Sequence, residues 1–171
     1  MVQRIIGIDP GTRHMGVVVL EGDRLLSYGV HTLRNGERPH DVIGQAKRIV
    51  LGYVARWSPS IVAYEAPLPI ATKQGAILNV IAQELRGRSR ELGLEVRSLS
   101  SAEVRQIVIG NPKANKIEVA QALIWMGFEE LTEKLPRKPA RSALGYRPKD
   151  KYWLHAFDAL GVAVAATSLK S

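Results

Sequence analysis

The fold of this chain is decided by the segment Arg4–Asp9, RIIGID, and by the apolar runs that follow it. The segment is mostly apolar and ends on an acid, which is typical of a strand buried in a sheet. Residues 10–12, Pro-Gly-Thr, predict a turn, and residues 15–20 and Arg24–Thr32 predict two more strands. Because the connections between them are short, we expect the three strands to form an antiparallel meander.

Helical and strand-like patterns alternate along the rest of the chain. Apolar spacing predicts helices over residues 41–57, 77–92, 116–126 and about 152–168, and a capping box at residues 100–103 opens a short helix that Gly110 closes. Residues 61–64 and 95–98 predict short strands. No repeat or second domain is visible, so we expect one α/β domain over residues 1–171, a mixed sheet flanked by helices.

Composition excludes several classes of protein. The 171 residues are 46% hydrophobic, which excludes a disordered chain. Cysteine is absent, so disulfides, zinc–thiolate sites and thiol catalysis are excluded. No apolar run approaches the roughly 18 residues of a membrane-spanning helix, and the N-terminus has no signal-peptide pattern. We therefore expect a cytoplasmic protein without a membrane partner.

The charge of the chain favours a polyanionic partner, nucleic acid above all. There are 24 Lys and Arg against 16 Asp and Glu, a net charge of +8. Six of these charges lie in residues 134–151, where Asp150 stands among seven basic residues: Lys134, Arg137, Lys138, Arg141, Arg147, Lys149 and Lys151. Prolines and Gly145 predict a loop. Either this is a solvated basic loop, or it is an arm that contacts phosphates, beside which Trp153 stacks on bases or packs in the protein.

Three acids and a histidine are the candidates for chemistry. Asp9 ends the first strand and Glu65 follows residues 61–64 in the same way, so both belong at the carboxyl edge of the sheet, where ligands often bind. His155 and Asp158 are three residues apart in an apolar, alanine-rich helix and share one helical face. The structural alternatives are a turn residue for Asp9, a packed histidine for His155 and a salt-bridged acid for Asp158.

Carboxylates that converge repel one another, and divalent cations allow them to ionise together. Carboxylate oxygens suit Mg²⁺ or Mn²⁺, and two such ions about 3.5–4 Å apart stabilise the attacking water and the leaving oxygen in phosphodiester hydrolysis. His155 suits Mn²⁺ better than Mg²⁺, or it orients the water or the scissile phosphate. A basic protein with an acidic metal site therefore indicates a nuclease.

Four segments, in order along nearly the whole chain, are similar to one known family. They are residues 5–12 (IIGIDPGT), residues 61–65 (IVAYE), residues 104–110 (VRQIVIG) followed by Lys113 and Lys116, and residues 155–163 (HAFDALGVA). These resemble, in turn, the opening strand, the second acidic strand, the basic helix–loop–helix segment and the C-terminal metal-site helix of RuvC-type Holliday junction resolvases. That family belongs to the RNase H-like (retroviral integrase) superfamily.

The resemblance implies a fold, a metal site and a set of DNA contacts. The fold is RNase H-like, with a five-stranded mixed sheet and helices on both faces. Asp9 is expected to bridge two Mg²⁺ ions, for which Mn²⁺ substitutes, with Glu65 and Asp158 completing the site and His155 acting as a ligand or as an orienter of water. The residues expected to contact DNA are Arg13, Lys73, Arg105, Lys113, Lys116, Arg137, Lys138, Arg141, Arg147, Lys149 and Lys151.

The activity that the resemblance implies is resolution of four-way DNA junctions by symmetric paired nicks that leave 5′-phosphate and 3′-hydroxyl ends. The family acts as a homodimer, which matches the rough two-fold symmetry of the junction. The sequence names no branch-migration partner. Many relatives carry an aromatic residue, thought to wedge into the junction centre, where this chain has Leu68. Insertion of Leu68 or Ile70 at the crossover is a hypothesis.

Three other functions stay open. A related RNase H-like nuclease that acts on RNA or on other branched DNA has the same metal-site chemistry. A catalytically silent junction-binding protein is the second, although a binder gains nothing from acids concentrated beside phosphates. An ATP-binding module is the third, because residues 7–12 (GIDPGT) also resemble the opening of sugar kinases and chaperone ATPases. Those proteins use two such domains, and we expect 171 residues to leave no room for the second.

Overall fold

The structure, a computed structural model, describes residues 3–34, 39–66, 73–136 and 151–169. Its strands and helices follow the order expected from the sequence, with bounds that differ by a few residues. They are β1 (Arg4–Asp9), β2 (His14–Glu21), β3 (Arg24–Thr32), α1 (Pro39–Trp57), β4 (Ile61–Glu65), α2 (Lys73–Glu91), β5 (Glu95–Leu99), α3 (Ser101–Ile109), α4 (Lys116–Trp125), η1 (Glu129–Lys134) and α5 (Leu154–Ser168). The 3₁₀ helix η1 was not predicted, because Leu131 is its one buried residue and leaves no apolar period to detect.

The strands form one five-stranded sheet in the order β3-β2-β1-β4-β5. Strands β1, β2 and β3 are antiparallel neighbours, which confirms the predicted meander. Strands β4 and β5 run parallel to β1, so the sheet is mixed. In the β1–β4 register Ile8 pairs with Tyr64, and the two strands therefore end side by side on Asp9 and Glu65.

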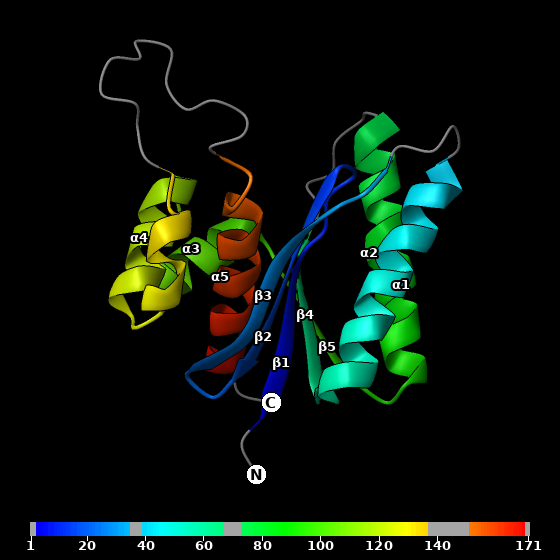
Figure 1. The fold of residues 1–171 in the computed structure, drawn as a ribbon, viewed down its shortest axis with the longest axis horizontal. Coiled ribbons are helices and arrows are strands. Elements are labelled where there is room, and N and C mark those ends of the chain that lie inside the picture. Colours follow the sequence, from blue (N-terminus) through cyan, green and yellow to red (C-terminus); the bar gives the residue numbers. More distant parts are fainter. Residues whose placement is uncertain (1–2, 35–38, 67–72, 137–150, 170–171) are drawn as a thin grey trace.

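Helices cover both faces of the sheet (Figure 1). Helices α1 and α2 lie over one face, and α3, α4 and α5 lie over the other. Successive strand residues point to opposite faces, so Ile5 joins the core under α5 while Ile6 and Ile8 join the core under α1 and α2. This arrangement confirms the α/β class. Within the described residues, no helix is both long and apolar enough to cross a membrane.

Two glycines let α5 lie unusually close to the sheet. A Cβ atom on Gly7 of β1 would lie 2.2 Å from the carbonyl oxygen of Ala159, and one on Gly16 of β2 would lie 1.9 Å from that of His155. Real Cβ atoms essentially never approach so closely. The glycines therefore set the height of α5 above the sheet, and with it the position of the polar residues in its first turns.

The far end of α5 is held by a buried arginine. Arg97 of β5, whose side chain is 8% exposed, donates from Nη1 to the carbonyl oxygen of Leu169 at 2.6 Å and to that of Ala166. Its Nε atom lies 2.7 Å from a carboxylate oxygen of Glu95. A cation at a helix C-terminus satisfies carbonyl groups that have no partner within the helix. Arg97 thus joins the edge strand to the last turn of α5.

Candidate active site

The candidate site lies where β1 and β4 end and α5 begins. Asp9 is the last residue of β1, and His155 is the second residue of α5. The Oδ2 atom of Asp9 lies 2.6 Å from Nδ1 of His155, and their side chains are 13% and 31% exposed. Both groups therefore face a narrow opening to solvent at the carboxyl edge of the sheet, as the strand pattern predicted.

Asp158 lies one helical turn after His155, and its side chain is 10% exposed. One ligand atom from each of Asp9, His155 and Asp158 lies within 4.8 Å of the other two, close enough to hold a single cation. Burial and, after it, the neighbouring charge of Asp9 raise the pKa of Asp158 to about 7, although Lys116 opposes both effects. Asp9 and Asp158 are thus held close together although their negative charges repel each other, and a bound divalent cation would offset that repulsion.

Glu65 lies beside this cluster but is turned to a different partner. It accepts a hydrogen bond from the hydroxyl of Ser101, the first residue of α3. Its carboxylate nevertheless raises the pKa of Asp158, so the acids of β1, β4 and α5 act on one another.

Two basic residues complete the site. Lys116, the first residue of α4, forms an ion pair with Asp158. Burial lowers the pKa of Lys116, but the carboxylates of Asp158, Asp9 and Glu65 outweigh that effect and raise it overall. Arg105 of α3 lines the same cleft as Glu65, Ser101, Lys116 and Asp158. The cleft therefore presents cations beside acids, which suits a phosphodiester together with divalent ions.

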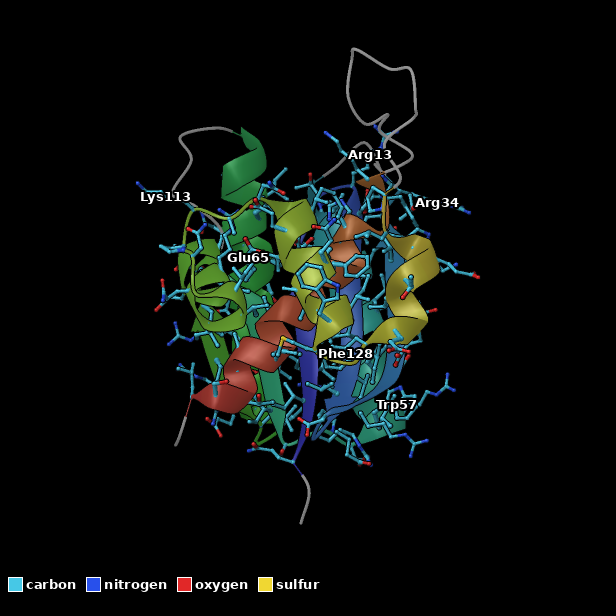
Figure 2. All side chains as sticks on the ribbon, turned by 90° about the vertical axis from the view of Figure 1, so that its left-hand side faces the viewer. Arg13, Arg34, Trp57, Glu65, Lys113 and Phe128 are labelled. Carbon is cyan, nitrogen blue, oxygen red and sulfur yellow. The ribbon has the colours of Figure 1, made fainter. Side chains whose placement is uncertain are left out.

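The other predicted DNA contacts divide into described and undescribed residues. Arg13, in the turn after Asp9, and Lys113, in the turn before α4, are exposed (Figure 2). Lys151 is exposed and lines a hollow together with Lys116. Trp153 packs against Tyr28, with Lys134 over its ring, so its ring is in contact with the protein. Outside the described residues lie the side chain of Lys73 and the residues Arg137, Lys138, Arg141, Arg147, Lys149, Leu68 and Ile70.

Comparisons with known proteins show what the chain is similar to. No protein-family model matches the chain. Two curated proteins named crossover junction endodeoxyribonuclease RuvC are similar to it. The protein from Methylocella silvestris is 29% identical over 173 residues, covering 98% of this chain and 88% of the relative. The protein from Akkermansia muciniphila is 28% identical over 122 residues, covering 68% and 73%.

A solved structure extends the likeness to three dimensions. T. thermophilus RuvC in complex with a Holliday junction substrate aligns with a TM-score of 0.72 and 25% sequence identity, over 96% of this chain and 93% of that one. The resemblance to RuvC-type resolvases is confirmed. The RuvC-type match also confirms the predicted RNase H-like fold with its five-stranded mixed sheet.

Two residues beside the candidate site were not identified from the sequence. Ser101 donates to Glu65, and His14 lies with its ring centre 5.7 Å from that of His155. Burial and the neighbouring charges of His155 and Arg13 lower the pKa of His14. In the structure Glu65 pairs with Leu99, which places Ser101, two residues further on, near Glu65. The sequence alone does not show this register. His14 had no signal in the sequence either, since it stands at the start of a strand.

Proposed function

We propose that this chain is a structure-selective, divalent-metal-dependent endonuclease that resolves four-way DNA junctions by symmetric paired nicks. The observation that carries the proposal is the convergence of Asp9, His155 and Asp158 within 4.8 Å at the carboxyl edge of a RuvC-type fold. The solved RuvC of T. thermophilus is described in complex with a Holliday junction substrate, which supports the same substrate class here.

The residues present suit divalent cations. Asp9, Glu65 and Asp158 supply hard oxygen ligands and His155 an imidazole nitrogen, while Lys116 is the one cation in an ion pair with the cluster among the described residues. Asp9, Glu65 and Asp158 would hold the divalent cations, Mg²⁺ or in its place Mn²⁺. Such ions, when bound, activate water and stabilise the charge that develops on the scissile phosphate.

The chain's own side chains then have distinct roles. His155, oriented by its contact with Asp9, holds a metal or orients the attacking water. Arg105 and Lys116 line the cleft and bind the phosphate groups on either side of the scissile bond. The exposed Arg13, Lys113 and Lys151 extend this contact to neighbouring phosphates. The same role stays proposed for Lys73 and for the basic residues of 137–149.

Further expectations belong to the same proposal. The active unit is a homodimer, so that two sites face opposed strands of one junction. Residues 1–171 form one nuclease domain. The cytoplasm is the proposed location.

Insertion of Leu68 or Ile70 at the crossover, in place of an aromatic wedge, stays a hypothesis. This hypothesis is tested by 2-aminopurine fluorescence at the junction centre, which Leu68→Ala and Ile70→Ala should change if either residue inserts.

The decisive experiment is cleavage of a synthetic immobile four-way junction, a matched duplex and an RNA–DNA hybrid with Mg²⁺, Mn²⁺ or EDTA. We expect paired symmetric nicks in the junction alone, lost in EDTA. Asp9→Asn should abolish cutting while junction binding stays the same or tightens, because one negative charge that faces DNA is removed. Retained cutting by that variant would contradict the metal-site assignment.

The same experiment separates the other functions. Cutting of the hybrid or of single strands would leave the metal site standing and assign a different substrate. Tight junction binding without cutting of any substrate would identify a silent binding protein. In the proposed case, Lys138→Ala or Arg147→Ala should weaken binding and reduce the salt slope by about one for each phosphate that the variant no longer binds.

A further inference from the structure

Helix α1 carries basic residues and glycines at every fourth position from His40 to Arg56. His40, Gly44, Arg48, Gly52 and Arg56 follow one another at steps of four residues, each turned by about 40° from the one before, so the row winds gradually around α1. Two hollows follow it. Arg34, His40 and Gly44 line the first, while His31, Tyr53 and Arg56 line the second. Arg48 lines both hollows, so the surface between α1 and β3 is continuous.

The positive charge of this surface is largely uncompensated. Among the described residues, Arg34, Arg48 and Arg56 have no carboxylate within ion-pair distance, whereas Lys47 on the adjacent side of α1 pairs with Glu84 at 3.2 Å. The acid on the surface, Asp41, lies 3.3 Å from the imidazole of His40. A surface that leaves arginines without acids is arranged for an anion from outside the chain.

The glycines keep the surface low between the arginines. A Cβ atom on Gly52 would meet nothing within 4 Å, and one on Gly44 would meet only Nη1 of Arg48 at 3.6 Å. Packing therefore does not require glycine at either position, although a glycine inside a helix costs about 0.5–1 kcal/mol relative to alanine. Without side chains at these positions, the backbone of a ligand is able to approach the helix closely.

The surface begins beside the candidate active site. Arg13 lies in the turn after Asp9, and its carbonyl oxygen accepts a hydrogen bond from the amide of Leu33 at 2.8 Å, next to Arg34. Figure 2 shows Arg13 and Arg34 near one end of the molecule and Trp57, the last residue of α1, near the other. At 1.5 Å per residue, the row from His40 to Arg56 spans about 24 Å along the helix axis, or about seven base pairs of duplex at 3.4 Å each.

We propose that this surface, the Arg34–Arg48–Arg56 track, binds the phosphate backbone of duplex DNA, so that one arm of a junction lies along α1 while its crossover lies at the site. The inference rests on the proposed function for the identity of the DNA. The arginines that line the two adjoining hollows offer successive contacts to the phosphates of a duplex. The paired His31 and Tyr53, whose Nε2 and hydroxyl oxygen are 3.1 Å apart, add a polar contact beside Arg56.

The first test compares two variants with the same loss of charge. Arg48→Gln/Arg56→Gln removes the track, while Arg86→Gln/Arg90→Gln removes two exposed arginines of α2 that have no described ion pair. Fluorescence anisotropy of a junction with long arms, in EDTA and over a range of salt, gives the affinity and its salt slope. We expect the track variant to bind about tenfold more weakly, with a slope reduced by about 1.8, and the control to change by less than twofold.

Equal weakening by both variants would overturn the track, because it would reveal a general effect of net charge. Thermal melting shows whether each variant folds. The two proposals fail separately: wild-type cutting with unchanged binding by the track variant rejects the track alone. Junction binding that depends on the track, without cutting, rejects the nuclease alone.

A second measurement does not depend on the arginine variants. The chain has no cysteine, so Gly52→Cys introduces a unique thiol at an exposed position with open space around it. A DNA-cutting iron chelate attached there should cleave one junction arm per protomer, several base pairs from the crossover. Cleavage near the crossover, or equally along a free duplex and all arms, would overturn the proposed path.

Discussion

The Nδ1 atom of His155 lies 2.6 Å from Oδ2 of Asp9, although 146 residues separate them in the sequence. The contact joins the end of β1 to the first turn of α5 and turns the imidazole toward the acidic cluster. We expect His155→Ala to reduce cutting with either metal. His155→Asp should shift the ratio of rates toward Mg²⁺ and away from Mn²⁺, because an oxygen ligand suits Mg²⁺ better. An unchanged ratio would show that the imidazole does not bind metal.

Substitutions of Ser101 and Ser100 distinguish an effect on the position of Glu65 from an effect on the stability of α3. Ser101→Ala removes the hydroxyl that donates to Glu65, and we expect metal affinity to fall by about tenfold, as for the loss of a group that orients a ligand. Ser100→Ala removes the cap of α3 and should cost about 1 kcal/mol of unfolding free energy without that effect on affinity. Calorimetric titration with Mn²⁺ and urea unfolding measure the two quantities. If Ser101→Ala bound Mn²⁺ as tightly as the unchanged protein does, Ser101 would have no role in positioning Glu65.

Alanine substitutions of Gly16 and Gly52 test the close approach of α5 to the sheet, with Gly52 as the control. Gly16→Ala places a Cβ atom 1.9 Å from the carbonyl oxygen of His155, and we expect it to destabilise the protein by about 1–3 kcal/mol or more. It should also weaken Mn²⁺ binding, since His155 and Asp158 must move. Gly52→Ala meets open space and should stabilise the protein by about 0.5–1 kcal/mol. Urea unfolding tests both, and a harmless Gly16→Ala would contradict the close approach.

Arg97→Met should be strongly destabilising, because it leaves the carbonyl groups of Ala166 and Leu169 without their donor. We expect a loss of about 2–4 kcal/mol, seen as a Tm lowered by about 5–10 °C. Glu95→Gln removes only the ion pair to a carboxylate that is 43% exposed, and should cost less than about 1 kcal/mol. Comparable losses in the two variants would assign the effect to the ion pair rather than to the carbonyl contacts.

His31 should make stability depend on pH. Burial lowers the pKa of His31 below its ordinary value of 6.5, so the unfolded chain takes up a proton at a higher pH than the folded chain does. The unfolding free energy should therefore fall as pH falls from 6.5 toward the lowered pKa, and His31→Gln should reduce that slope. Urea unfolding between pH 7.5 and pH 5 in EDTA, over about two units around the ordinary histidine value, measures it. The same slope in both proteins would contradict a titration of His31.

Much of the fold could be predicted because its elements carry strong local patterns. The apolar β1 and β2 and the capping box before α3 are all observed, and Asp9 and Glu65 end their strands as expected. The close contacts within the site could not be predicted. Whether Glu65 faces Asp9 or Ser101 depends on side-chain rotamers and on the approach of α3, and neither leaves a periodic signal. The helix η1 was missed for the same reason, since a single buried Leu131 has no period.

The residues of the acidic cluster are synthesised at very different times during translation. Asp9 comes from the opening strand, whereas His155 and Asp158 lie in α5, a helix buried against the centre of the sheet. At about 5–20 residues per second, synthesis reaches Asp158 roughly 7–30 s after Asp9. Until then a nascent chain has the strand but neither the helix that completes its core nor the residues that complete its cluster. If the chain is the nuclease proposed here, it is harmless to DNA while it is being translated, and maturation of the fold and onset of cutting are the same event.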